Sequence, residues 1–382
     1  MKDTANFSEY IAYLYKMRDG KRFRYDPSQG DYQTWAAGVR KILEPHLTLQ
    51  DDGAPLNVKT LDVKQKDGYR QETIELNVDG YLRLKGAVLV PENGEKKHPA
   101  VVALNCHGWQ YYYDLYKMLE PEEEIPYITK MKDDFFGSRS VANEMAKRGY
   151  LVVYLETFYF GENRLDVENV PQLFKDEFHV DPAQFEKGSL EYIDASDLFS
   201  RRFEAYMYKY LAFAGQSWTG LNLKNDKKAI DYLLTRDDVD PDRIGCVGLS
   251  LGGFRSLMLA GMDARIKCAV VAGWMACLPD MLEDSRCKFH TFMMFQPSLW
   301  ALIDFPDLVA LNAPNSLIVI NGLQDEQFKG ADKADDRMKK IYAMAGHPEN
   351  YVSNFYDTPH MFNAQMQDDA YAFMETHLKN LK

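Results

Sequence analysis

The strongest chemical signal in the sequence is the run Gly248-Leu249-Ser250-Leu251-Gly252, which has the form G-x-S-x-G. This pattern alone is weak, but here an apolar, strand-like segment runs into it and a helix-like segment, 254–260, runs out of it. On such a turn, glycines let the backbone fold tightly and leave the serine hydroxyl exposed at the start of the helix. We therefore interpret Ser250 as a nucleophile rather than as part of a simple glycine-rich turn.

A serine hydroxyl is a poor nucleophile without a base, and in this chemistry the acid and then the histidine follow the serine along the chain. Asp325 comes just after the apolar strand-like run 316–320, so its carboxylate is expected at the same edge of the sheet as Ser250. The neighbouring Glu326 is the fallback acid. A turn or helix-capping role is the alternative for Asp325.

Three histidines follow Asp325, and their places relative to the predicted strands separate them. His360 lies in the loop after the last predicted strand, 351–356, and that loop returns to the edge that carries Ser250. His347 precedes the strand, at its wrong end, and His377 falls in the terminal helix. His360 is therefore the expected base, with capping or packing as its alternative role.

Acyl transfer also needs hydrogen-bond donors for the oxyanion that develops on the substrate. The backbone N–H of Leu251, directly after the serine, is one expected donor. The second should come from the loop Asn105-Cys106-His107-Gly108-Trp109, and we assign it to the N–H of Trp109. His107 is expected to support this loop rather than to act as a base, because it precedes the serine in the chain.

The elements that must position these residues form an α/β pattern. Three segments joined by Asp-Gly turns read as antiparallel strands, and five short apolar segments that alternate with helices read as buried strands of a mostly parallel, doubly wound sheet. The antiparallel segments are 57–63, 72–78 and 81–89; the buried ones are 100–105, 150–155, 243–248, 266–272 and 316–320, and 351–356 is the last strand. Helices are expected at 140–148, over much of 203–234 and at 361–378, with an interruption at Ser217.

The predicted organisation is an N-terminal helical extension, 1–55, followed by a catalytic domain, 56–382. Two connections in this domain, near 109–137 and 157–200, are longer than a normal crossover and are expected to cover the site. Whether the N-terminal helices cover the pocket or make a contact in a homo-oligomer stays open.

Composition narrows the classes of partner. The 382 residues carry 45 Lys and Arg against 57 Asp and Glu, a net charge of −12, which argues against nucleic acid or an anionic membrane as the main partner. No apolar run approaches a membrane span, and Met1–Tyr10 shows no signal-peptide pattern, so a cytoplasmic location is expected. Five cysteines without C-x-x-C spacing indicate reduced, mostly buried thiols. No motif indicates a metal or cofactor.

Several local patterns resemble the α/β-hydrolase superfamily, and more narrowly its dienelactone hydrolase and acetyl xylan esterase-like branch. The resemblance covers roughly 85–380 and implies a serine hydrolase that acts on esters without a cofactor. The chain differs from that branch at Glu156, where an aspartate is usual, at Leu251, and in the long insertion 110–137, so the substrate stays open. The patterns are His107-Gly108, Arg148-Gly149-Tyr150, Phe160-Gly161-Glu162-x-Arg164, Asp240-Pro241-Asp242-Arg243-Ile244-Gly245 and Asp263-x-Arg265-Ile266.

The sequence thus predicts a serine carboxylic ester hydrolase that acts on an acetylated carbohydrate or another small acyl ester. His107, Tyr159 and Trp274 are candidate substrate-binding residues, because aromatic rings gather in the segments that overhang the site. The alternative for each ring is packing of the covers onto the sheet. The alternative functions are a peptidase, a lactone or carbon–carbon hydrolase with the same triad, and a ligand-binding protein without turnover.

Overall fold

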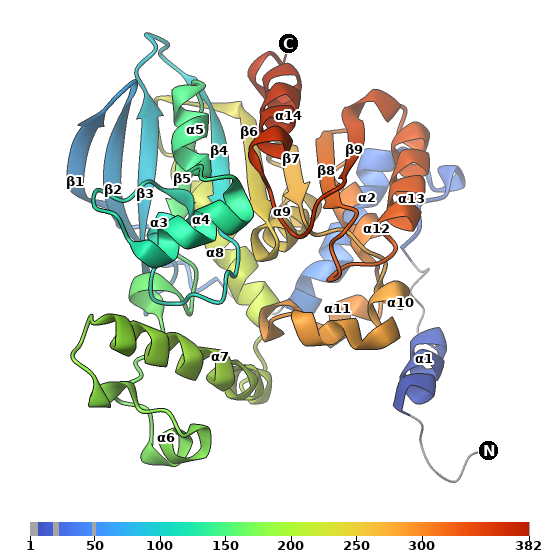
Figure 1. The fold of residues 1–382 in the computed structure, drawn as a ribbon. Coiled ribbons are helices and arrows are strands. Elements are labelled where there is room, and N and C mark those ends of the chain that lie inside the picture. Colours follow the sequence, from blue (N-terminus) through green and yellow to red (C-terminus); the bar gives the residue numbers. More distant parts are fainter. Residues whose placement is uncertain (1–6, 18–22, 48–50, 382) are drawn as a thin grey trace.

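The computed structural model describes residues 7–17, 23–47 and 51–381. Most of the Met1–Tyr10 stretch and parts of the predicted N-terminal extension, 18–22 and 48–50, lie outside the described residues. One nine-stranded sheet organises the chain, in the order β1-β2-β3-β5-β4-β6-β7-β8-β9 (Figure 1). The first three strands pair antiparallel, β3 pairs antiparallel with β5, and the pairs from β5 to β9 are parallel. The predicted fold class is confirmed.

The strands fall close to the predicted segments. Their bounds are β1 Lys59–Lys66, β2 Tyr69–Asn77, β3 Arg83–Pro91, β4 His98–Leu104, β5 Leu151–Leu155, β6 Val239–Leu249, β7 Ile266–Ala272, β8 Ser316–Gly322 and β9 Tyr351–Tyr356. The central strands are buried on both faces, and successive side chains of β4 alternate between two cores. Val102 and Leu104 belong to one core, whereas Val101 and Ala103 belong to the other.

Helices cover both faces of the sheet (Figure 1). Several helices contribute buried residues to each core. Those of the first core include α2 Tyr32–Leu43, α8 Trp218–Leu233, α9 Leu251–Met262, α12 Phe305–Ala310 and α13 Ala331–Met344; those of the second include α5 Val141–Lys147 and α14 Ala364–Met374. Every helix within the described ranges is too short or too polar to cross a lipid bilayer.

The N-terminal segment contains two helices with different surroundings. In α2, the Tyr32 hydroxyl donates to the carbonyl of Ala310 at 2.7 Å, and Arg40 Nε donates to the carbonyl of Gly261 at 2.8 Å. These bonds fix α2 against α9 and α12. The preceding helix, α1 Phe7–Met17, is mostly exposed and lies beside the short helices α10 Leu278–Met281 and α11 Pro297–Trp300 (Figure 1). The boundary at residue 55 stays a prediction.

The two long connections carry helices of their own. The first contains α3 Leu115–Met118 and α4 Pro126–Phe136, and the second contains α6 Gln172–Phe178 and leads into α7 Leu190–Phe213. Helices α6 and α7 bury a small apolar cluster that projects below the sheet (Figure 1). The helical stretch predicted over 203–234 is divided between α7 and α8, where Ser217 caps α8 by accepting from the Gly220 N–H at 3.0 Å.

Candidate active site

Ser250 stands on a sharp turn between β6 and α9. Its φ and ψ of 60° and −119° lie outside the regions that an ordinary L-residue prefers, so the turn holds the serine in a strained conformation. The Ser250 N–H donates to the carbonyl of Ala272 at 2.9 Å, which ties the turn to the end of β7. Helix α9 begins at Leu251, whose N–H therefore has no acceptor within the helix and can serve a ligand oxyanion.

Close packing around the turn explains the second glycine of the motif. A Cβ atom on Gly252 would lie 2.2 Å from the Leu104 carbonyl oxygen at the end of β4. Atoms cannot approach this closely, and the obstacle is backbone rather than a flexible side chain. The glycine at the fifth position of the G-x-S-x-G motif thus follows from the close approach of α9 to β4.

The substitution Gly252→Ala should therefore destabilise the protein by about 3 kcal/mol, because the new methyl group forces α9 away from the sheet. The matched control is Gly38→Ala in α2, where an added Cβ meets nothing within 4 Å. That change should stabilise the protein by about 0.5–1 kcal/mol, since alanine favours helix. Urea unfolding followed by circular dichroism measures both, and equal effects at the two positions would contradict this packing argument.

The structure brings the predicted acid and base together. Nδ1 of His360 lies 2.5 Å from Oδ2 of Asp325. The Asp325 side chain is 4% exposed, and its other oxygen accepts from the Gln327 N–H at 2.9 Å. Backbone bonds join the two loops that carry these residues: the Leu323 N–H donates to the Tyr356 carbonyl at 2.7 Å. The loops after β8 and β9 thus hold the carboxylate against the imidazole.

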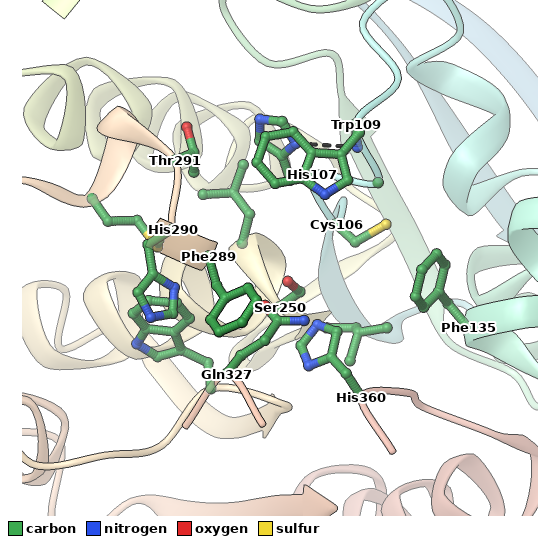
Figure 2. A pocket seen from close by; sticks show the side chains of 15 residues that line it. Cys106, His107, Trp109, Phe135, Ser250, Phe289, His290, Thr291, Gln327 and His360 are labelled. Atoms are coloured by element: carbon green, nitrogen blue, oxygen red, sulfur yellow. Dashed lines mark hydrogen bonds between the residues drawn. The ribbon is translucent and has the colours of Figure 1, made fainter. Parts of the chain in front are cut away.

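His360 and Ser250 face one cavity, where Figure 2 shows them next to each other. Gly273, with φ of 55°, lies behind the His360 ring; a Cβ atom there would be 3.2 Å from His360 Cε1. The other two histidines lie elsewhere. His347 contacts Glu349 at 3.1 Å on the surface, and His377 lies 3.1 Å from the Ser316 hydroxyl.

The cavity around Ser250 is small, with a volume of about 60 Å³. The first cover, 109–137, and the segment after β7 contribute lining residues, whereas none of the lining residues belongs to the second connection, 157–200. The lining residues are Cys106, His107, Gly108, Trp109, Phe135, Leu249, Ser250, Leu251, Trp274, Phe289, His290, Thr291, Met294, Gln327 and His360. Among the described residues, no group of three or more His, Cys, Asp or Glu side chains is placed to bind a metal ion.

His107 is part of a buried network that ties the loop after β4 to α7. Its Nε2 lies 2.7 Å from Glu204, and the hydroxyls of Tyr111 and Thr291 each donate to the Glu204 carboxylate at 2.8 Å. Burial alone would raise the pKa of Glu204, but the contacts with His107, Thr291 and Tyr111 together lower it, so this carboxylate is ionised at neutral pH. The network supports the predicted structural role of His107.

Trp109 lines the cavity, but its N–H is already engaged. It donates to Nδ1 of His107 at 3.1 Å, so Nε2 of that ring carries the proton and donates to Glu204. The expected role of the Trp109 N–H as second oxyanion donor does not fit this arrangement unless that bond opens. Trp109 is 39% exposed, and the guanidinium of Arg201 lies over its ring, 4.1 Å from the ring centroid.

Buried charges hold the same loop from behind. Arg255 of α9 donates to the Asn105 side chain, whose amide donates to Asp114. Lys117, also fully buried, lies 3.5 Å from Asp114 and donates to the carbonyl of His107 at 3.0 Å. Because an unpaired buried charge is costly, this chain of contacts fixes the position of the loop relative to α9 and Ser250.

The three predicted substrate-binding residues have different outcomes. His107 and Trp274 line the cavity. Tyr159 does not: it is 1% exposed, its hydroxyl donates to the carbonyl of Ser200 at 2.9 Å, and its ring packs on Trp218. Its prediction is corrected, because the ring packs the cover onto the sheet instead of facing the site.

Two further titratable groups in the cavity do not compete for the roles of nucleophile and base. Burial raises the pKa of the Cys106 thiol to about 11, so it is protonated at neutral pH. Burial, together with repulsion from His360, lowers the pKa of His290 to about 4, so this ring is neutral. No motif in the sequence indicates His290 or Glu204, because His290 lies in the irregular segment after β7 and the helical pattern around Glu204 does not show which loop that helix meets.

Comparison with known proteins agrees with the fold. The sequence profile of the Abhydrolase family matches residues 7–372. A protein of Bacillus subtilis (strain 168) with the name "Putative hydrolase YtaP" is 23% identical over 329 residues, which cover 86% of this chain and 94% of that protein. The family match spans nearly the whole chain, and the chain belongs to the Abhydrolase family of α/β-hydrolases.

Solved structures share the same fold. One, described as "a putative acetyl xylan esterase (BF1801) from Bacteroides fragilis", superposes with a TM-score of 0.68 at 20% identity and covers 94% of this chain and 84% of that one. Another is a glucuronoyl esterase from Solibacter usitatus, with a TM-score of 0.60 at 13% identity, covering 91% and 94%. At these identities the likeness concerns the fold.

Proposed function

We propose that this α/β-hydrolase is a serine carboxylic ester hydrolase. The observation that carries the proposal is the arrangement around one small cavity: Ser250 on its strained turn, and His360 beside it with Asp325 at 2.5 Å. The esterase names of structural relatives are consistent with it. A cavity of about 60 Å³ at the serine suits a small group such as an acetyl on the reacting carbon.

In the proposed reaction, His360 accepts the Ser250 hydroxyl proton as the oxygen attacks the ester carbonyl. The Leu251 N–H donates to the resulting oxyanion, and Asp325 stabilises the imidazolium. The tetrahedral intermediate then breaks its bond to the alcohol, which takes the proton from His360. Water, deprotonated by His360, attacks the acyl-enzyme in the same way and releases the acid.

A substrate panel tests this proposal against hydrolases that use the same triad. We expect turnover of p-nitrophenyl acetate and of acetylated sugars, with aminoacyl p-nitroanilides and simple lactones at least about 100-fold slower in kcat/KM, a difference of about 2.7 kcal/mol in activation free energy. Faster cleavage of the amide would favour a peptidase, and faster opening of the ring a lactone hydrolase. Binding of an ester without release of acid would favour a non-catalytic ligand-binding protein.

A further inference from the structure

A second, larger cavity adjoins the catalytic one. Its volume is about 220 Å³, and its walls are almost wholly apolar. The two cavities share Trp274, His290 and Met294, so these three side chains form a shared wall at which the chamber meets the serine cavity. Residues that line only the chamber include Leu278, Met281, Leu282, Phe295, Trp300 and Phe305.

The size and chemistry of the chamber define what it can hold. An apolar cavity of about 150 Å³ in a protein stays dry and accepts benzene, so a volume of 220 Å³ has room for an aromatic ring or a chain of about six carbons. The walls offer such a group dispersion contacts and removal from water. Met294 in the shared wall is unbranched and adapts its shape easily to a neighbour.

Two polar atoms in the shared wall have no partner. Nε1 of Trp274 and Nε2 of His290 are buried and meet no hydrogen-bonding group among the described residues. A buried polar atom without a partner costs about 1–3 kcal/mol, and an oxygen of a bound molecule could accept from the Trp274 N–H. Because the His290 ring is neutral, it places no charge against the apolar chamber.

We propose that this chamber binds an apolar group of the ester, a ring or a chain of about six carbons, while the ester carbonyl lies at Ser250. The inference rests on the proposed ester hydrolysis and narrows it to esters with one such group, on the acyl or on the alcohol side. Tyr15 of α1 also lines the chamber, so the N-terminal helix contributes to substrate selection.

Chain-length series test the chamber directly. The acyl series compares p-nitrophenyl acetate with the hexanoate, and the alcohol series compares methyl acetate with hexyl acetate, followed by acid release. Each buried methylene can contribute up to roughly fourfold in kcat/KM, so the six-carbon ester should exceed its short counterpart by at least about tenfold in one series. The responding series identifies the side of the ester that enters the chamber.

The decisive variant is Leu278→Trp, because Leu278 is partly exposed and lines the chamber without lining the catalytic cavity. We expect the advantage of the six-carbon ester to fall about tenfold while the short ester changes less than twofold. Leu234→Trp, at the exposed end of α8, is the matched control and should change neither. Equal effects of Leu278→Trp on short and long esters, or no chain-length preference in the unmodified protein, would overturn the proposal.

Two further measurements keep the outcome unambiguous. If Leu278→Trp fails to fold by circular dichroism, Leu278→Ala replaces it and should shift the preference toward the octanoate or octyl ester. If the unmodified protein cleaves no ester, the proposed function fails; binding of 1-hexanol, followed by tryptophan fluorescence, then tests the chamber alone. Binding that Leu278→Trp abolishes would support the chamber, and no binding would overturn it.

Discussion

Replacing Ser250 with alanine should lower kcat/KM for p-nitrophenyl acetate by roughly 10⁴- to 10⁶-fold, because the covalent route depends on this hydroxyl. Substrate binding should persist, since the cavity and the Leu251 N–H remain. The backbone at Ser250 already has a positive φ, so alanine meets the same backbone strain as the serine. Alanine is also smaller than serine, and the variant should therefore fold. The measurement is steady-state hydrolysis with matched protein concentrations and circular dichroism spectra.

The control for this experiment is Ser217→Ala. Ser217 resembles the motif serine at the level of sequence, with Gly215 before it and Gly220 after it, but it caps α8 instead of lining the cavity. Its replacement should cost about 1 kcal/mol of stability through the lost cap and leave turnover unchanged. Undiminished hydrolysis by the Ser250 variant would contradict the assignment of the nucleophile.

The second large effect is expected from Asp325→Asn. The asparagine keeps the shape of the side chain but removes the negative charge that lies 2.5 Å from Nδ1 of His360. The ring would lose both its enforced tautomer and the stabilisation of its protonated form, and kcat should fall by roughly 10³- to 10⁴-fold. Hydrolysis of the same activated ester measures this loss.

The adjacent residue supplies a matched control. Glu326 is exposed, whereas the Asp325 side chain is buried against the imidazole, so Glu326→Gln should change kcat less than twofold. The two substitutions remove the same charge one position apart. A loss in Glu326→Gln that equals the loss in Asp325→Asn would show that long-range charge, and not the contact with His360, matters for the rate.

Much of the fold could be predicted because strong local patterns agree with the tertiary structure. The predicted strands 266–272 and 351–356 coincide with β7 and β9. A short apolar segment between two turns is too short for most helices, so its pattern indicates a strand. The division of the predicted helix into α7 and α8 also follows a local signal, the capping Ser217. Helix α7 itself begins at Leu190, inside the connection 157–200 that the sequence predicts to be a cover.

The candidate site could be predicted where chemistry depends on position at a strand end. Ser250, Asp325 and His360 each follow a strand whose carboxyl end lies at one edge of the sheet, so topology brings them together. These assignments of role remain predictions for the experiments above. Their meeting around one cavity is a property of the structure.

The remaining contacts depend on how loops and covers pack against the rest of the protein. The spacing of apolar residues in the sequence does not determine this packing. An aromatic residue in a cover can face the site or the core with the same sequence, and Tyr159 faces the core. The N–H of Trp109 meets the ring of His107 because both residues lie in one tight loop. Glu204 reaches that loop from α7, almost 100 positions away, and the chamber joins Tyr15 to Trp274 across most of the chain.

Labelling with a fluorophosphonate, followed by peptide mapping, tests the central claim most directly, because the reagent modifies only a serine that a neighbouring base activates. The account predicts modification at Ser250 that is lost in His360→Ala and after heat denaturation. A folded sample that takes up no label, or that takes it up at another serine, would contradict the claim that Ser250 and His360 form a working nucleophile and base.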